Sequence, residues 1–207
     1  MSKIMVLYHR SDYDGIFCRE IAKKFLPDAT LIGWDFADTP VDFPTEGIVY
    51  VLDLPPEQPF GRELAFEEKE RVIWIDHHAS SLAQTINRMT GYKFKGYRID
   101  GVAACRLAWQ YLKEKDPQWI THLDGFPTKE DFIERRVTEP VAVRLAGGYD
   151  IWDKRDPNAE LFQHGLRSKE LTDHDWSEML SIKTSTPPIV RQLLENGKVL
   201  QHAITKP

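Results

Sequence analysis

The sequence is poor in cysteine, in long apolar runs and in excess positive charge. Two cysteines, Cys18 and Cys105, occur among 207 residues. Both fall in helix-like stretches, so we expect buried free thiols rather than a disulfide framework. No run approaches the roughly 20 apolar residues of a membrane span, and the start, MSKIMVLYHR, lacks the pattern of a signal peptide. These absences predict a cytoplasmic protein that does not engage a membrane.

The charge balance limits the partners of the protein. There are 27 Lys and Arg residues against 32 Asp and Glu residues, a formal net charge of −5. A protein that grips a long DNA duplex is expected to carry a basic face, so this balance argues against such a partner. Phosphate-containing substrates remain compatible with it if metal ions supply the positive charge.

Short apolar runs alternate with helical patterns over the first two-thirds of the chain. This alternation predicts an α/β fold, a parallel five-stranded sheet with helices on both faces. The predicted strands cover residues 4–9, 29–36, 47–54, 71–78 and 92–99. The predicted helices cover 15–26, 61–70, 101–115 and 129–149, the last of them broken or kinked at Pro140.

The pattern changes after Asp150, where short helices are joined by polar or Pro-rich links. The last 40 or so residues contain too few apolar positions for an independent core. We therefore expect a domain over residues 1–165 and a short helical C-terminal extension over 166–207. The segment IVRQLLENGKVL has the spacing of an amphipathic helix. It could pack back as structural cover, mediate self-association or lead to a further domain.

Titratable side chains follow three of the predicted strands. They are His9, Asp12 and Asp14 after the first strand, Asp53 after the third, and Asp76, His77 and His78 after the fourth. Each aspartate alone is more simply a turn or cap residue. Ligands of parallel sheets, however, bind where the strands end. For these three strands to bring their ends together they must be neighbours, which gives the strand order 2-1-3-4-5.

Four aspartates and three histidines at one edge would stay unpaired unless cations neutralise them. Carboxylate and imidazole ligands suit Mn²⁺, Fe²⁺, Co²⁺ or Zn²⁺, and the lack of a nearby cysteine argues against a structural zinc site. Seven groups are too many for one ion. Two divalent ions that share a carboxylate would use them.

The ordered set HRSDYDG, VLDL, IDHH and YDIWD resembles the motifs of the DHH phosphoesterase superfamily. This superfamily includes the exonuclease RecJ, oligoribonucleases, cyclic-dinucleotide phosphodiesterases, exopolyphosphatases and family II pyrophosphatases. The resemblance covers residues 1 to about 165. It implies a parallel sheet and a dinuclear centre, usually of manganese, with Mg, Co, Fe or Zn as other candidates.

The resemblance also implies roles for individual residues. His9 and Asp12 would bind the first metal ion, Asp14, His77 and Asp150 would bind the second, and Asp53 would bridge both ions. Asp76 would hold His77 in position, and His78 would face the substrate phosphate. The catalytic set implied in this way is His78, Asp53 and Asp76.

The sequence departs from the family pattern at three places. Two residues, Arg10 and Ser11, separate His9 from Asp12, where many members have three. The segment Gly101–Ala104 lacks the hydroxyl residue that is common there, although its backbone N–H groups could still meet an anion. No glycine-rich motif of a second domain appears in residues 166–207, so we expect a minimal form or a chain that lacks this domain.

The expected activity is metal-dependent hydrolysis of phosphodiester bonds in a short oligonucleotide or a small, linear or cyclic, nucleotide. Besides His78, the candidate substrate-binding residues are Arg10, Tyr13 and Arg98, with Tyr13 able to stack on a base. Two alternatives stay open. One is a phosphoanhydride hydrolase of the pyrophosphatase or exopolyphosphatase type, and the other is a non-catalytic protein that binds nucleotides or metal.

Overall fold

The computed structural model describes residues 3–82, 94–114, 128–134 and 138–205. The chain forms two compact units, Met1–Arg136 and Val137–Pro207, and each is described here by itself. The predicted boundary after residue 165 falls inside the second unit, where helix α8 (Asn158–Leu166) ends. The assignment of catalysis to the part before that boundary stays a prediction.

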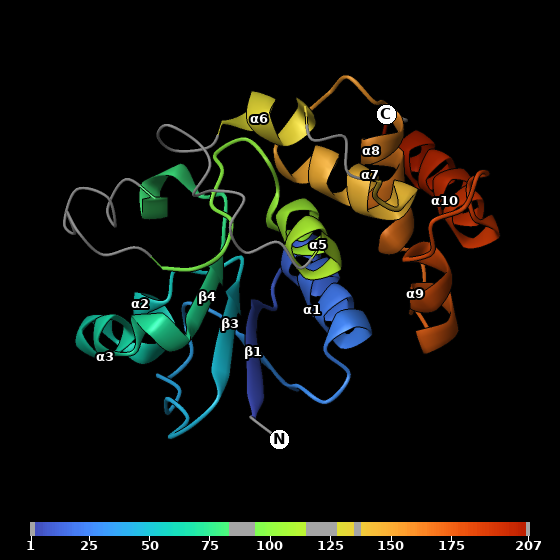
Figure 1. Ribbon diagram of the computed structural model, residues 1–207. Helices are drawn as coiled ribbons and strands as arrows, with labels where there is room; N and C mark the ends of the chain where they lie inside the picture. Colours follow the sequence, from blue (N-terminus) through green and yellow to red (C-terminus); the bar gives the residue numbers. More distant parts are fainter. Residues whose placement is uncertain (1–2, 83–93, 115–127, 135–137, 206–207) are drawn as a thin grey trace. The chain divides into compact units, whose positions relative to one another are not determined.

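The first unit is built on a parallel sheet (Figure 1). Its strands are β1 (Ile4–His9), β2 (Thr30–Trp34), β3 (Ile48–Leu52) and β4 (Val72–Ile75). They lie in the order β2-β1-β3-β4, and every neighbouring pair is parallel. The predicted order of the first four strands is therefore confirmed, and β1, β3 and β4 end side by side.

The predicted fifth strand is wrong. Residues 92 and 93 lie outside the described residues, and the segment from Phe94 onward forms only two isolated parallel bridges, Ile73 with Lys95 and Asp76 with Arg98. Between the bridges, Gly96 has a φ of +111°, and a Cβ atom there would lie 2.1 Å from the carbonyl oxygen of Trp74. This left-handed residue interrupts the regular ladder, so the sheet has four strands within the described part of the chain.

Helices of the first unit cover both faces of the sheet. They are α1 (Tyr13–Phe25), α2 (Glu57–Phe60), α3 (Arg62–Glu67), the 3₁₀ helix η1 (Lys69–Arg71), α5 (Ala104–Glu114) and α6 (Lys129–Glu134). Phe60 and Phe66, from α2 and α3, pack on a buried cluster of strand residues that includes Val51 and Trp74. α1 packs against α5 and β1. Right-handed crossovers on the two sides of β1 place α1 and the α2–α3 pair on opposite faces.

The second unit is helical. Its helices are α7 (Val141–Asp150), α8, α9 (Asp173–Met179) and α10 (Pro188–Thr205). Pro140 immediately precedes α7, so the predicted helix break at this proline is confirmed. The amphipathic segment forms α10, which packs on α8 and buries Ile189, Val190 and Leu193. Among the described residues, none of the helices combines the length and apolar character that crossing a membrane requires.

Replacing Gly96 with alanine should lower the free energy of unfolding of the first unit by about 3 kcal/mol or more, because the new side chain adds a clash to backbone strain. Gly61 supplies a matched control, since it has a φ of +78° but no atom lies within 4 Å of the place that its Cβ would occupy. Gly61→Ala should cost about 1–2 kcal/mol. Urea titration followed by tryptophan fluorescence compares the two, and equal losses would show that the close approach to Trp74 imposes no constraint.

Candidate metal centre

The site lies where β1, β3 and β4 end together. Tyr8 of β1 pairs with Leu52 of β3, and Leu52 pairs with Ile75 of β4, so the next residue of each strand lies at the same level. Those next residues are His9, Asp53 and Asp76. The backbone N–H of Asp53 donates to the carbonyl of Ile75 at 2.9 Å, which ties the ends of β3 and β4 together.

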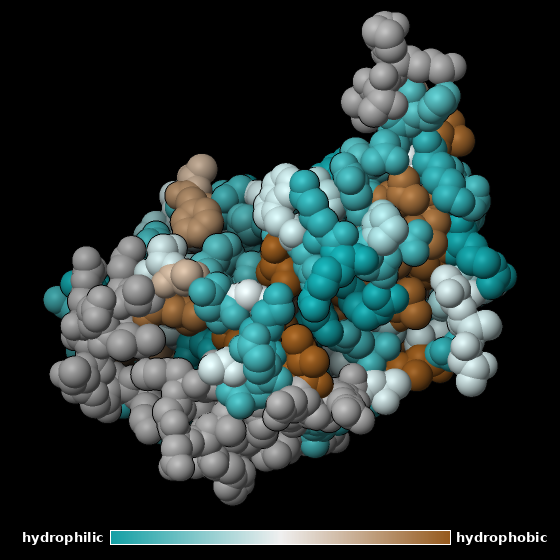
Figure 2. All heavy atoms as spheres, turned by 90° about the horizontal axis from the view of Figure 1, so that it is seen from above, coloured by the Kyte–Doolittle hydropathy of each residue, from teal (hydrophilic) through white to brown (hydrophobic). Residues whose placement is uncertain are grey.

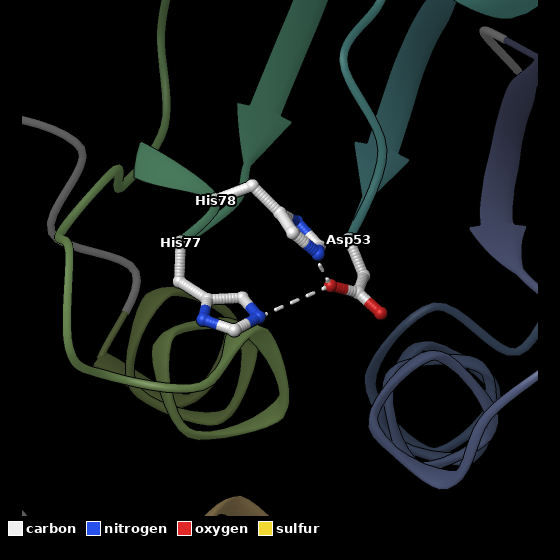
Figure 3. Close-up of side chains that lie close together, drawn as sticks. All are labelled: Asp53, His77 and His78. Carbon is white, nitrogen blue, oxygen red and sulfur yellow. Dashed lines mark ion pairs between the residues drawn. The ribbon is translucent and has the colours of Figure 1, made fainter. Parts of the chain in front are cut away.

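Asp53 is at the centre of this edge. Its side chain is 1% exposed, and neither carboxylate oxygen has a hydrogen-bond partner among the described residues. Its Oδ1 lies 3.5 Å from Nε2 of His77 and 3.7 Å from Nδ1 of His78, and Figure 3 shows both rings turned toward it. Its Oδ2 lies 3.7 Å from Nδ1 of His9. These separations are too long for hydrogen bonds, and burial raises the pKa of Asp53.

The backbone of Asp53 is also unusual. Its φ of +61° is in the left-handed region, which aspartate adopts more readily than most residues but still at a cost. Strained conformations of this kind cluster at functional sites. The strand end therefore holds a buried carboxylate in an uncommon backbone conformation, with three histidines at 3.5–3.7 Å but no hydrogen-bond partner among the described residues. These features make Asp53 a candidate ligand residue.

His9 and Asp12 form a first group with Asp53. Nδ1 of His9 lies 2.7 Å from Oδ2 of Asp12, and the three side chains can offer ligand atoms within 4.8 Å of one another. Asp12 is also the N-cap of α1, because its Oδ1 accepts a hydrogen bond from the backbone N–H of Gly15 at 2.9 Å. Asp12 can therefore cap α1 and also serve as a metal ligand, because each role uses a different carboxylate oxygen.

Gly15 explains how α1 can start so close to the site. A Cβ atom at this position would lie 1.8 Å from the carbonyl oxygen of His9. Only a residue without a side chain allows this close approach of the helix to the end of β1. The glycine in the motif HRSDYDG therefore sets the distance between α1 and the strand end.

Asp14 connects the site to α5. Its Oδ2 and Oδ1 accept hydrogen bonds from the backbone N–H groups of Ala104 at 2.8 Å and Cys105 at 2.9 Å. The N-terminus of α5 does meet an anion, and that anion is this carboxylate. Oδ2 of Asp14 also lies 3.5 Å from Nε2 of His77. Burial, followed by repulsion from Asp53, raises the pKa of Asp14 to about 6.

Asp76 contacts both of the histidines that follow it, and its predicted role in positioning His77 stays a prediction. Its Oδ1 lies 2.8 Å from Nδ1 of His78 and accepts hydrogen bonds from the backbone N–H groups of His77, at 2.7 Å, and His78, at 3.2 Å. It thus contacts the imidazole of His78 and the backbone of His77. The hydrogen bond to Asp76 raises the pKa of His78. Asp76 is fully buried, whereas 45% of the His78 side chain is exposed.

His78 belongs to a second group. Asp53, His77 and His78 can also offer ligand atoms within 4.8 Å of one another, so both groups contain Asp53. The remaining predicted ligand, Asp150, is the last residue of α7 in the second unit. Its role as a ligand stays a prediction.

The predicted substrate-binding residues differ in their surroundings. Tyr13 is the half-buried first residue of α1, beside the site. Arg10 is exposed but forms a two-pronged ion pair with Asp38. Arg98 donates to the backbone carbonyls of Trp74, Phe94 and Lys95 and lies over the Trp74 ring, so its guanidinium fastens the interrupted fifth segment to β4. These contacts argue against Arg98 as a substrate-binding residue.

Two residues that follow β2 and lie beside His9 were not identified from the sequence. Oδ1 of Asp35 lies 3.7 Å from Nε2 of His9, and the Asp35 carboxylate accepts a hydrogen bond from Ser11 Oγ. The ring of Phe36 packs edge-on against His9, with 5.8 Å between ring centroids. The predicted strand order already placed β2 beside β1. That order could have indicated that the residues after β2 lie at the same edge of the sheet as His9.

Comparisons with known proteins give the fold only. No protein-family model matches the chain, and no curated protein matches it. A solved structure, of an uncharacterized protein from Helicobacter pylori G27, is similar with a TM-score of 0.51 and 15% identity. The similarity covers 99% of this chain, which spans 66% of the length of that protein. At this identity the match supports the arrangement of helices and strands and carries nothing about activity.

The charge of His9 should make the stability of the metal-free protein depend on pH. Asp12, and then Asp53, raise the pKa of His9 from 6.5 to about 10. The folded state therefore binds this proton more tightly than the unfolded chain. The resulting stabilisation is complete below pH 6.5 and is lost as the pH rises toward 10.

Thermal melting in a chelator, recorded from pH 6 to 10, measures this dependence. His9→Gln should flatten the decline, because it removes the titrating group. His174→Gln, which alters an exposed histidine of the second unit, should keep the wild-type slope. A wild-type slope in His9→Gln would mean that His9 does not hold a proton against Asp12.

Proposed function

We propose that the protein is a metal-dependent phosphohydrolase. Its two divalent ions, most suitably Mn²⁺, would share Asp53, and its substrate would be a short oligonucleotide or a small nucleotide with a phosphodiester bond. The observation that carries the proposal is the environment of Asp53, a carboxylate 1% exposed and without a hydrogen-bond partner among the described residues. It belongs to two potential ligand groups at once.

The donor set fits such ions. His9, Asp12 and Asp53 would hold one ion, and Asp53 and His77, with Asp14 beside them, would hold the other. The donors are carboxylate oxygens and imidazole nitrogens, a mixture that suits Mn²⁺ and its neighbours in the first transition row. A buried carboxylate beside two further acids is costly without a cation. Bound ions would remove this cost.

Divalent ions in such a centre would supply a reactive water near neutral pH and offset the charge of the phosphate. The protein itself would position the substrate with His78. Asp76 fixes one nitrogen of this ring, Nδ1, at 2.8 Å and favours its protonated form. The other nitrogen, Nε2, would then donate a hydrogen bond to a phosphate oxygen as negative charge develops. Asp76 would act through His78 as a positioning residue.

Asp53→Asn should abolish hydrolysis and weaken Mn²⁺ binding at both sites, because the bridging carboxylate would touch both ions. Calorimetric titration with Mn²⁺ and hydrolysis of a dinucleotide measure the two effects. The metal-free variant should melt no lower than the wild type, since burial already disfavours the charge of Asp53. Asp131→Asn changes a half-buried aspartate at the start of α6 and should leave both properties intact. Near wild-type turnover of Asp53→Asn at matched metal concentration would refute the two-ion assignment.

His77→Ala and His78→Ala should have different effects. His77→Ala should lower the metal content of the purified protein, because it removes a ligand. His78→Ala should retain metal but lose turnover by about a hundredfold or more, the loss typical of removing one donor to a developing oxyanion. Elemental analysis and turnover on the same samples separate the two roles. Equal loss of metal in both variants would make His78 a ligand instead.

A further inference from the structure

A large aromatic ring is exposed beside the proposed metal centre. Phe36 follows β2 and is 58% exposed, although its ring lies edge-on to His9 at 5.8 Å and to Trp34 at 5.7 Å. Figure 2, seen from the side on which the strands end, shows a mainly hydrophilic surface with separate apolar side chains. An exposed phenylalanine is by itself ordinary. The position of this one, in contact with a proposed metal ligand, raises the question of what the ring serves.

The turn that carries Phe36 is held firmly. The backbone N–H of Asp38 donates to the carbonyl of Asp35 at 2.8 Å, and the side chain of Asp38 accepts from the backbone N–H of Asp35 at 2.9 Å. Arg10 binds the Asp38 carboxylate with two nitrogens. Trp34 Nε1 donates to the carbonyl of Thr39 at 3.0 Å, which fixes the far side of the turn. The ring is therefore presented in one place rather than on a loose loop.

The charges around Phe36 select what can lie on it. Asp35 lies directly before it and Asp38 two residues after it, and only Asp38 is paired with Arg10. The Asp35 carboxylate accepts a hydrogen bond from Ser11 Oγ. A second phosphate on the ring would face this negative charge. A neutral, flat group would not, and it would gain from stacking.

We propose that Phe36 is a stacking platform for a nucleobase of the substrate. The proposal rests on the proposed function and deepens it, because it makes the substrate a nucleotide or short oligonucleotide rather than an inorganic phosphoanhydride. A nucleotide carries its phosphate and its base on one sugar. The phosphate can therefore lie at the His9–Asp53 edge while the base lies on the neighbouring ring. Arg10 acts here as a positioning residue that braces the turn through Asp38.

Fluorescence tests the platform independently of any activity. Phe36→Trp places an indole at the exposed position, and Phe36→Leu keeps an apolar side chain without a ring. Both variants are titrated with adenosine and with ribose in the presence of a chelator, so that no phosphate meets the acidic edge. Quenching by adenosine in Phe36→Trp, beyond that in Phe36→Leu and absent with ribose, supports the proposal. Equal responses to the two compounds, or no response, overturn it.

Kinetics then tests the role of the ring in substrate choice. The measured quantity is the ratio of kcat/KM for a dinucleotide to kcat/KM for its abasic counterpart. Phe36→Ala and Phe36→Leu should lower this ratio on the order of tenfold, the loss of one stacked base, whereas Phe36→Tyr should keep it. An unchanged ratio in Phe36→Ala overturns the platform. If no phosphate substrate is hydrolysed at all, the proposed function is wrong. The fluorescence titration then still shows whether a base stacks on Phe36.

Discussion

The burial of the Asp53 carboxylate is the constraint on which the rest of the site depends. A buried carboxylate without a hydrogen-bond partner costs several kcal/mol, and β3 places this one between the ends of β1 and β4. The metal-free protein responds by holding protons where cations would bind. The pKa of His9 rises to about 10 beside Asp12 and Asp53, and burial raises the pKa of Asp14 to about 6. In the proposed function, divalent ions would compete with these protons for one cluster of negative charge.

The helices fix the acids that surround Asp53. Asp12 caps α1 with one oxygen and leaves the other facing His9. Asp14 accepts from two N–H groups at the start of α5 and still faces His77. Each carboxylate therefore has its position set by a helix terminus, where an anion is favourable. This arrangement orients the potential ligands through backbone N–H groups and couples the geometry of the site to the packing of α1 on α5.

The sequence predicted the parts of this architecture that depend on local pattern. Apolar runs that end in acids and histidines indicated the strands, and the need for their ends to meet fixed the order of the first four. The sequence did not predict the features that depend on tertiary contacts. Gly96 interrupts the fifth segment because its backbone approaches Trp74. The contact of Asp76 with the ring of His78 was not predicted, because it depends on that ring and backbone N–H groups converging on one oxygen.

The guanidinium groups of Arg10 and Arg98 are both engaged by other parts of the protein. Arg10 is engaged by Asp38, and Arg98 faces three backbone carbonyls. The contacts of both candidate arginines of the first unit are therefore with the protein itself, and their predicted role in substrate binding stays a prediction. In the proposed function, a phosphate at this acidic edge would be repelled until divalent ions reversed the local charge. Metal binding would then come before phosphate binding, and the neutral base on Phe36 would be the one part of the substrate that needs no ion.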